Sequence, residues 1–225
     1  MPAAGARAQK RAQERGGQGM IGLTREDGLW TVTLSRPEKA NSLTRAMLGD
    51  LLSIAGDAAA EGARALILTG AGTVFSAGAD LDEARAGLAT DPVWERLSGA
   101  VAGLPCLTIA ALNGTLAGGA FGMALACDIR LAVPAASFFY PVMRLGFLPQ
   151  PSDPGRLVAL VGPARAMMIL MAGAKISADE ALASGLVDRI VPPDQLAGAA
   201  RALASDALGA DAGHVAAIKA MIAKG

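Results

Sequence analysis

The chain has 225 residues, and its 20 Lys and Arg side chains balance 20 Asp and Glu side chains, so its formal net charge is zero. Hydrophobic residues make up 52% of the sequence but aromatic residues only 4%, so the core has to be built mainly from small and aliphatic side chains. A neutral chain lacks the basic field that phosphate binding needs, which argues against a nucleic-acid binder. No stretch approaches the ~18 consecutive apolar residues of a membrane span, and we expect a cytoplasmic protein that does not enter a membrane.

Residues 1–19 differ in composition from the remainder of the chain, since they are basic and contain no apolar run. The missing apolar run excludes a secretory signal peptide. Such a composition buries too little surface to offset the entropy lost on ordering. We therefore expect a disordered basic tail over residues 1–19 and a single domain over residues 20–225.

Strands and helices are predicted to alternate along this domain. Leu29–Leu34 alternates apolar residues with threonine, which predicts a half-buried strand. Apolar residues at helical spacing predict a helix from about Thr44 to Ala60, and the nearly all-apolar Ala65–Thr69 predicts a strand covered on both faces. The same alternation continues with a helix over Val93–Ala102, a strand over Leu107–Leu112, a helix from about Gly118 to Ala126 and a strand over Ile129–Val133. This spacing indicates βαβ units and an α/β fold.

The C-terminal third carries clear helix signals. Ser177 and Glu180 have the spacing of a capping box, and Gly185 is a typical helix stop. The short apolar stretch Leu186–Val191 ends at Pro192-Pro193, and two alanine-rich helices are expected after it.

Thiol and metal chemistry have little support. Cys106 and Cys127 lie 21 positions apart in apolar sequence, without CxxC spacing, and are best interpreted as small buried hydrophobic residues. His214 is the only histidine, and we expect it at the surface. No metal site is predicted.

Two glycine-rich segments, Phe75–Leu81 and Asn113–Gly122, each follow a predicted strand and open the next element. Free N–H groups at a helix start favour an anion, and glycine lets a ligand approach the backbone closely. Neither segment fits the dinucleotide or P-loop pattern. Each segment alone is more typical of a purely structural turn. Together they predict backbone N–H groups aimed at a carbonyl oxygen.

A longer pattern emerges when short segments are taken in order along the chain. They are Arg36–Leu43, Leu68–Gly70, Phe75–Leu81, Asn113-Gly114, Gly118-Gly119, Ala124–Arg130, Leu145-Gly146 and Ser184–Val187. This pattern resembles the crotonase superfamily, the family of enoyl-CoA hydratases and isomerases, and covers nearly everything from residue 20 to about residue 220.

The resemblance implies an architecture and a substrate class. The implied fold is a crotonase-like α/β spiral of repeated ββα units with C-terminal helices, assembled as a homotrimer or hexamer. The implied partner is an acyl-CoA thioester, with no cofactor beyond the coenzyme A of the substrate itself. Family members usually continue for some tens of residues past the point where this chain ends, so the acyl site is expected to be more open or closed by a neighbouring subunit.

The resemblance also assigns residues. It makes the backbone N–H groups of Ala79 and Gly119 the two donors that hold the thioester carbonyl oxygen, as preorganised donors would for a developing enolate. Other residues that it places around the substrate are Lys39, Ala77, Leu81 and Gly118. For Lys39, a site near the coenzyme A phosphates and a solvated loop lysine are equally good interpretations.

Two departures from the family concern its catalytic glutamates. By the resemblance, these positions are occupied here by Gly122 and Val142, which cannot act as general acid or base. The resemblance therefore implies decarboxylation, thioester hydrolysis or isomerisation rather than hydration. The alternative is a catalytically weak acyl-CoA-binding or assembly subunit.

Other side chains compete for the proton-transfer role. Asp153 is a candidate, although its place between two prolines favours a turn, and Gln150 takes the slot in the most direct alignment. Tyr140 could protonate a carbanion, but its neighbours Phe138 and Phe139 favour a packing role. A peptidase built on Ser76 lacks a histidine at a plausible place.

Overall fold

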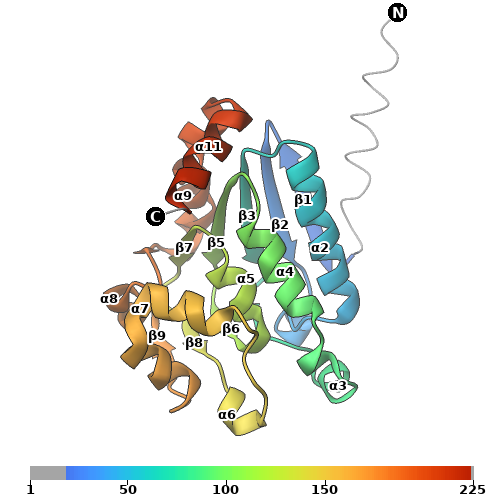
Figure 1. Ribbon diagram of the computed structural model, residues 1–225, viewed down its shortest axis with the longest axis vertical. Helices are drawn as coiled ribbons and strands as arrows, with labels where there is room; N and C mark the ends of the chain where they lie inside the picture. Colours follow the sequence, from blue (N-terminus) through green and yellow to red (C-terminus); the bar gives the residue numbers. More distant parts are fainter. Residues whose placement is uncertain (1–18, 224–225) are drawn as a thin grey trace, which may run out of the picture.

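The computed structural model describes residues 19–223, and the tail expected over residues 1–19 lies, except for Gly19, outside them. The described chain forms two β-sheets covered by helices (Figure 1). The larger sheet contains β1 (Ile21–Glu26), β2 (Leu29–Leu34), β3 (Ala65–Gly70), β5 (Leu107–Leu112), β7 (Ile129–Ala132) and β10 (Arg189–Ile190). The smaller sheet contains β4 (Val74–Ser76), β6 (Thr115–Ala117), β8 (Ser137–Phe139) and β9 (Ile176–Ser177).

Helices surround both sheets. The α-helices are α2 (Arg45–Ala60), α3 (Leu81–Arg85), α4 (Val93–Ala102), α5 (Phe121–Leu125), α6 (Val142–Leu145), α7 (Asp153–Leu170), α8 (Ala178–Ser184), α9 (Leu196–Leu203), α10 (Ser205–Gly209) and α11 (Ala212–Ile222). Short 3-10 turns are η1 (Pro37–Lys39), η2 (Leu88–Thr90), η3 (Gly118–Ala120) and η4 (Pro193–Gln195).

The order of strands reveals a repeat. The larger sheet runs β1-β2-β3-β5-β7-β10 and the smaller one β4-β6-β8-β9. In the larger sheet β2, β3, β5, β7 and β10 are mutually parallel, whereas β1 joins β2 as an antiparallel hairpin. Each of the consecutive pairs β3–β4, β5–β6 and β7–β8 gives one strand to each sheet and is followed by a helix. The expected α/β class and its ββα repeat are confirmed.

Most predicted elements are present with nearly the expected bounds. The strands over Leu29–Leu34 and Leu107–Leu112 and the helix over Val93–Ala102 agree at both ends. The capping box of Ser177 with Glu180 is formed, and Gly185 ends the helix with a φ of 82°. The six-residue strand β1 was not predicted, and neither were β4, β6, β8 and β9, whose two or three residues are too few to establish a period.

The C-terminal prediction was partly wrong. Three α-helices follow the apolar stretch instead of two, and within that stretch Arg189–Ile190 pairs with β7 as β10. The third begins because Ala210 is extended and the Asp211 side chain accepts hydrogen bonds from two N–H groups of the next turn. This N-cap restarts a helix that alanine content alone would have continued.

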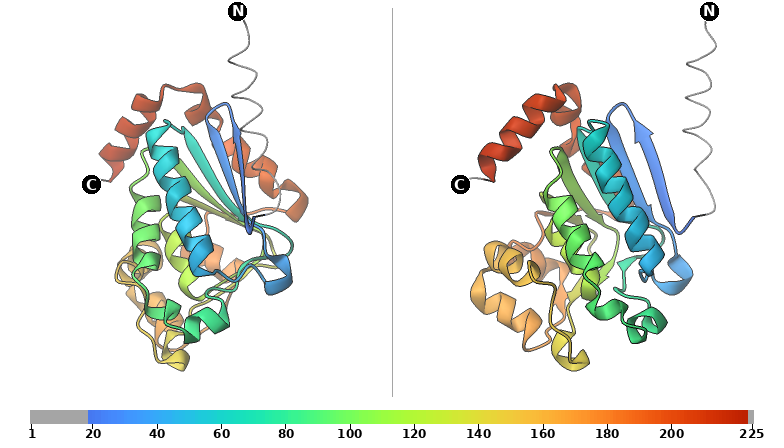
Figure 2. Two further views of the ribbon diagram at one scale, coloured as in Figure 1. Left: turned by 90° about the vertical axis from the view of Figure 1, so that its right-hand side faces the viewer. Right: turned by 45° about the vertical axis from the view of Figure 1, so that its right-hand side comes forward.

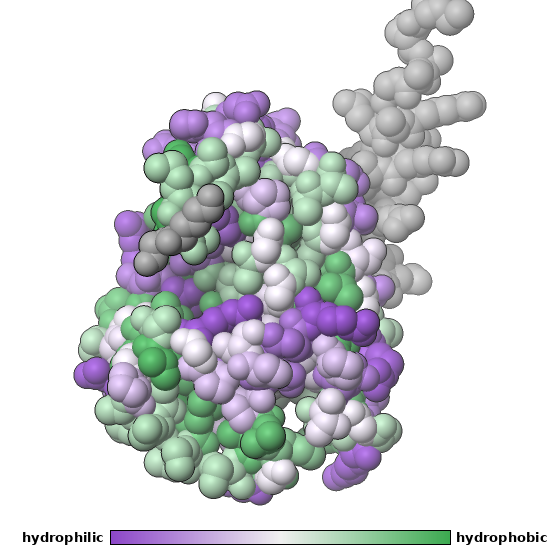
Figure 3. Space-filling view, in the orientation of Figure 1, coloured by the Kyte–Doolittle hydropathy of each residue, from purple (hydrophilic) through white to green (hydrophobic). Residues whose placement is uncertain are grey.

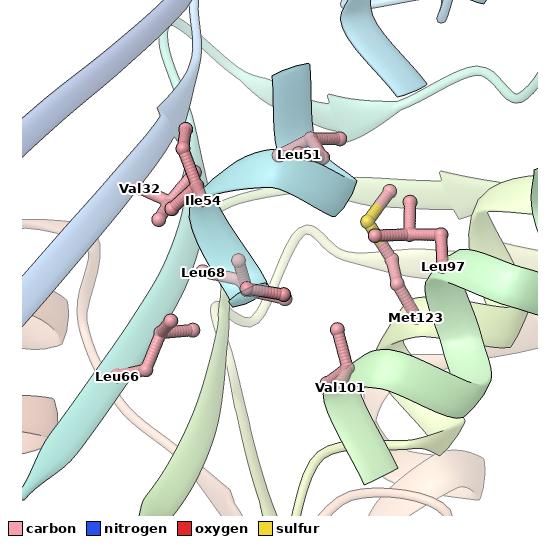
Figure 4. Close-up of a pocket in the computed structure, with 9 residues that line it drawn as sticks. Val32, Leu51, Ile54, Leu66, Leu68, Leu97, Val101 and Met123 are labelled. Carbon is pink, nitrogen blue, oxygen red and sulfur yellow. The ribbon is translucent and has the colours of Figure 1, made fainter. Parts of the chain in front are cut away.

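Helices α2 and α4 pack against the larger sheet and enclose the aliphatic core (Figures 2 and 4). A small void of about 10 Å³ remains there, lined by side chains such as Val32 and Leu68 of the sheet, Leu51 of α2, Leu97 of α4 and Met123 of α5. No polar side chain lines it, so it has nothing to orient a ligand. It is a feature of core packing.

We expect Gly114→Ala to destabilise the fold strongly. Gly114 lies between β5 and β6, and a Cβ there would come within 1.9 Å of the Thr73 carbonyl oxygen. Because that neighbour is backbone, the loss of unfolding free energy should reach about 3 kcal/mol or more. Urea unfolding, monitored by circular dichroism, measures this loss of unfolding free energy.

The matched control is Gly56→Ala in the middle of α2, where a Cβ would meet nothing within 4 Å. Alanine there should increase stability by about 0.5–1 kcal/mol through helix propensity. Equal effects of the two substitutions would contradict the close approach at Gly114.

Candidate functional site

The first glycine-rich segment is held by the chain that precedes α2. The Leu43 N–H donates to the Gly78 carbonyl oxygen at 2.7 Å, and the Asp80 N–H donates to the Leu43 carbonyl oxygen at 2.9 Å. In such a parallel pairing the residue between the two bonded ones turns its own N–H and C=O to the opposite side. The N–H of Ala79 therefore faces away from Leu43.

Two polar side chains fix this arrangement. Arg36 forms an ion pair with Asp80 at 2.7 Å, with both side chains largely buried. The Arg36 guanidinium and the backbone N–H groups at the start of α3 hold the pKa of Asp80 below its usual value. The Asn41 side chain donates to the carbonyl oxygens of Ala71 and Val74 at 2.9 and 2.7 Å. The Asp80 side chain also caps the start of α3.

The two glycine-rich segments lie in direct contact. A Cβ on Gly78 would lie 2.9 Å from the Ala117 carbonyl oxygen and 3.3 Å from the Gly118 Cα. Gly78 and Gly118 also have φ values of +91° and +56°, a region that side chains disfavour. Only glycine fits both the conformation and the contact, so these residues bring the two backbones together.

Both segments open into one pocket at the end of the molecule that carries α3 and α6 (Figure 1). Its volume is about 130 Å³, and it is partly open to solvent. The sequence-predicted residues that line it are Ala77, Ala79, Leu81, Gly118, Gly119 and Val142. Lys39 lies exposed at the end of η1 and does not line this pocket.

Two backbone N–H groups of this lining have no acceptor in the described part of the chain. Neither Ala79 nor Gly119 donates a turn, loop or side-chain hydrogen bond within residues 19–223. Gly119 is the second residue of η3, where an N–H has no partner inside the helix. The Trp94 ring covers Gly119, since a Cβ there would meet ring atoms at 3.1–3.2 Å.

Apart from Gln150, the rest of the lining is apolar and aromatic. Trp94, Phe139, Phe147 and Leu148 were not predicted as pocket residues, because they come from three separate places along the chain. The Leu81 and Leu148 side chains are 72% and 87% exposed. Figure 3 shows a hydrophobic surface over this end of the molecule. Among residues 19–223, no charged side chain lines the pocket, and Tyr140 is the only titratable residue of the lining.

Asp153 is not the turn residue that its flanking prolines favoured. It is the first residue of α7 and only 1% exposed. The following Pro154 fits the first turn of a helix, a start signal that the sequence analysis overlooked. The Tyr140 hydroxyl donates to Asp153 Oδ2 at 2.9 Å, whereas Asp153 Oδ1 is buried with no hydrogen-bond partner in the described structure.

Gly122 provides the space for this carboxyl group. A Cβ on Gly122 would lie 3.0 Å from Asp153 Oδ1 and 3.4 Å from the Ser98 Cβ. Gly122 is buried in α5 behind the pocket lining. A side chain at position 122 would therefore compete for the volume that Asp153 now fills.

Side chains of α4 anchor the start of α7. Glu95 accepts hydrogen bonds from the Ser152 hydroxyl and, at 3.2 Å, from the Ser152 N–H. Arg156 donates to the Ser98 hydroxyl at 3.0 Å. These contacts fix the helix turn that carries Asp153.

Burial is the main influence on the pKa values of Asp153 and Tyr140. Loss of solvation raises the pKa of Asp153 to about 6, although the Tyr140 hydrogen bond and Arg156 oppose the rise. Burial and the neighbouring Asp153 also raise the pKa of Tyr140 far above its usual value. A carboxyl group that titrates near neutrality can both take and give a proton.

The remaining candidates have structural roles. Ser76 is fully buried, donates to the Asn41 carbonyl oxygen and accepts from the Gly78 N–H, so its hydroxyl is not free. His214 is exposed, as expected, on α11 at the opposite end of the molecule from the pocket (Figure 1).

Both cysteines are buried, as expected, and burial raises the pKa of the Cys106 and Cys127 thiols to about 11 and 12. Residues 19–223 contain no group of three or more His, Cys, Asp or Glu side chains that could hold a metal ion. Within the same residues, no helix has the length and apolar character needed to cross a membrane.

We expect Asp153→Asn to stabilise the fold, and more so at high pH. A carboxyl whose pKa rises from 3.8 to about 6 on folding binds its proton more tightly in the folded state, so stability falls as the pH rises between these values. Above them the ionised group lowers the free energy of unfolding by about 3 kcal/mol. The neutral amide avoids this penalty.

Urea unfolding at about pH 8 and about pH 4 measures the difference in unfolding free energy between Asp153→Asn and the wild-type protein. This difference should shrink below about 1 kcal/mol at the lower pH. Asp50→Asn on the exposed face of α2 is the matched control and should have little effect at either pH. A gain for Asp153→Asn that is independent of pH would contradict the raised pKa.

Comparisons with known proteins agree with this geometry. A family model described as Enoyl-CoA hydratase/isomerase matches residues 24–225. A probable enoyl-CoA hydratase of Mycobacterium bovis, echA6, is 36% identical over 172 residues, which are 76% of this chain and 70% of the relative. A probable enoyl-CoA hydratase of Rhodobacter capsulatus is 39% identical over 171 residues, 74% of this chain and 66% of the relative.

Solved structures give the same result for the fold. The enoyl-CoA hydratase of Bacillus anthracis superposes with a TM-score of 0.85 at 34% identity, covering 91% of this chain and 83% of that chain. A Geobacillus kaustophilus structure, entitled as an enoyl-CoA hydratase subunit, superposes with a TM-score of 0.83 at 32% identity, covering 92% and 82%. The expected crotonase fold is thereby confirmed, and the chain belongs to the enoyl-CoA hydratase/isomerase family of the crotonase superfamily.

Proposed function

We propose that this protein binds an acyl-CoA thioester and holds its carbonyl oxygen with the backbone N–H groups of Ala79 and Gly119. One observation carries the proposal: these two N–H groups lack partners in the described chain and belong to segments that touch at Gly78 and Gly118 beside one pocket. The apolar lining suits an acyl chain, and the relatives named enoyl-CoA hydratase point to the same substrate class.

The physical benefit lies in the enolate. When a thioester loses a proton or a carboxylate from its α-carbon, negative charge moves to the carbonyl oxygen. Donors fixed in place before the reaction stabilise that charge by about 3–4 kcal/mol each. Here the backbone of both donors is fixed by the pairing with Leu43 and by η3, so little reorganisation is needed.

The reaction is proposed to differ from hydration. Gly122 and Val142, which stand at the family's glutamate positions by resemblance, offer no proton donor or acceptor. Decarboxylation, thioester hydrolysis or isomerisation would use the same enolate or carbonyl stabilisation. We propose no cofactor beyond the coenzyme A of the substrate, and place its adenine end along the backbone from Ala77 to Leu81.

A second candidate function is a catalytically weak acyl-CoA-binding or assembly subunit. The observation that favours it is the pocket lining, which has no charged side chain. Assembly as a homotrimer or hexamer is also proposed, and the exposed Met167, Met168 and Met171 of α7 supply apolar surface for it. Light scattering of the purified chain measures the subunit number.

We expect crotonyl-CoA to bind without rapid hydration. Binding is measured by titration calorimetry and hydration by the loss of enoyl absorbance. The rate should be about 10²–10⁴-fold below that of a family member that has its acid–base group. A free-thiol assay detects thioester hydrolysis, and mass spectrometry of a carboxylated acyl-CoA detects decarboxylation. Rapid hydration would contradict the proposed reaction class, whereas absent binding would contradict both candidate functions.

We expect the carbonyl oxygen itself to contribute to affinity. A thioether analogue of butyryl-CoA has the same chain but lacks this oxygen, so it leaves the two N–H groups unpaired. At about 0.5–1.5 kcal/mol per hydrogen bond, its dissociation constant should be about 5- to 150-fold larger. Equal affinities for thioester and thioether would mean that the two N–H groups do not bind the carbonyl.

A further inference from the structure

The pocket contains one side chain that can move a proton. Tyr140 lines it, together with Ala79 and Gly119, and is its only titratable residue. The phenol ring stacks on Phe121, with ring centroids 5.3 Å apart and an interplanar angle of 20°. Only 4% of the residue is exposed. Stacking and burial therefore hold the Tyr140 ring in one place in the wall of the pocket that Ala79 and Gly119 also line.

Asp153 stands directly behind Tyr140, outside the pocket lining. Its Oδ2 accepts the Tyr140 hydroxyl proton at 2.9 Å, and the same hydroxyl oxygen lies 3.5 Å from the Gln150 N–H. Its Oδ1 is buried and without a partner in the described structure. Burying a carboxyl group this way is unfavourable, and its position next to a phenol that lines the pocket points to proton chemistry.

We propose that Tyr140 is the catalytic residue that exchanges a proton with the α-carbon of the bound thioester, and that Asp153 is the positioning residue that receives and returns this proton through the phenol. This inference rests on the proposed thioester site. It assigns proton transfer to a pair of residues outside the two positions that Gly122 and Val142 occupy.

The step is balanced without any further reactant. The phenol oxygen takes the α-proton while its own proton passes to Asp153 Oδ2. The electron pair of the C–H bond forms the carbon–carbon double bond of the enolate, and the carbonyl π pair moves to the oxygen held by Ala79 and Gly119. Tyr140 is neutral before and after, and Asp153 changes from carboxylate to acid. The reverse step returns a proton to the α-carbon.

The surroundings of Asp153 suit this role. Glu95 of α4 and Arg156 of α7 are the charged groups that influence its titration, with opposite effects, and Tyr140 hydrogen-bonds to it. Helix α5 contributes Gly122, which has no side chain. Burial is therefore the largest influence on the pKa of Asp153, which it raises to about 6.

The test is deuterium exchange at the α-carbon of butyryl-CoA, a saturated thioester that cannot be hydrated. The wild-type protein in D₂O should incorporate deuterium, as seen by mass spectrometry. The rate should rise with pH through about 6, as Asp153 becomes a carboxylate, and then level off. Calorimetric binding of butyryl-CoA is measured in parallel for every variant.

Two substitutions separate the roles. Tyr140→Phe keeps the stacked ring but removes the hydroxyl, and Asp153→Asn keeps the shape but removes the base. Each should slow exchange by about 10²–10⁴-fold with butyryl-CoA affinity changed less than about 3-fold. Asp153→Asn should also abolish the rise near pH 6, which a purely structural role would not affect. Asp50→Asn, on the exposed face of α2, should retain the wild-type rate.

The outcomes are distinguishable. Exchange that is lost in both variants while binding persists supports the proposal. Binding by the wild-type protein without exchange, or exchange that survives in either variant, overturns the proton relay and leaves the thioester site standing. Absence of binding by the wild-type protein overturns the proposed function and the relay together. If Tyr140→Phe does not fold, Asp153→Asn alone decides between these results.

Discussion

The contact between the two glycine-rich backbones is the constraint on which the candidate site depends. Gly78 and Gly118 approach so closely that a Cβ on the first would lie 2.9 Å from the Ala117 carbonyl oxygen. Backbone hydrogen bonds of Leu43 with Gly78 and Asp80 hold the Gly78 segment in this contact. The Arg36–Asp80 ion pair further fixes that segment. Residues 36–43 thus act on the site without lining its pocket.

The fold places the backbone groups that we propose hold a ligand and the side chains that we propose react with it in different repeats. The backbone N–H groups of Ala79 and Gly119 come from the starts of helical turns after β4 and β6. Tyr140 and Asp153 come from the next repeat, after β8, and from the start of α7. Because the holding groups are backbone, side-chain substitutions in later repeats leave them in place, so the chemistry can change while binding geometry remains.

The sequence predicted the fold and the two backbone segments well, because glycines, Asn113 and Asp80 report local geometry directly. It predicted the strands of the larger sheet better than those of the smaller one, which have only two or three residues each. It failed for Asp153, where the flanking prolines favoured a turn although the Asp153-Pro154 pair also fits a helix start. Pairing between Tyr140 and Asp153 depends on how α7 packs, and nothing local reveals it.

Gly122 leaves the space that the buried carboxyl group of Asp153 occupies. A Cβ at position 122 would lie 3.0 Å from Asp153 Oδ1, so a longer acidic side chain there and the present Asp153 conformation exclude each other by volume and by charge. A buried acid without a full set of partners lowers stability, and an apolar residue would pack the same space at less cost. A carboxyl group that persists under these conditions, hydrogen-bonded to the pocket's only phenol, is better explained by proton transfer than by packing.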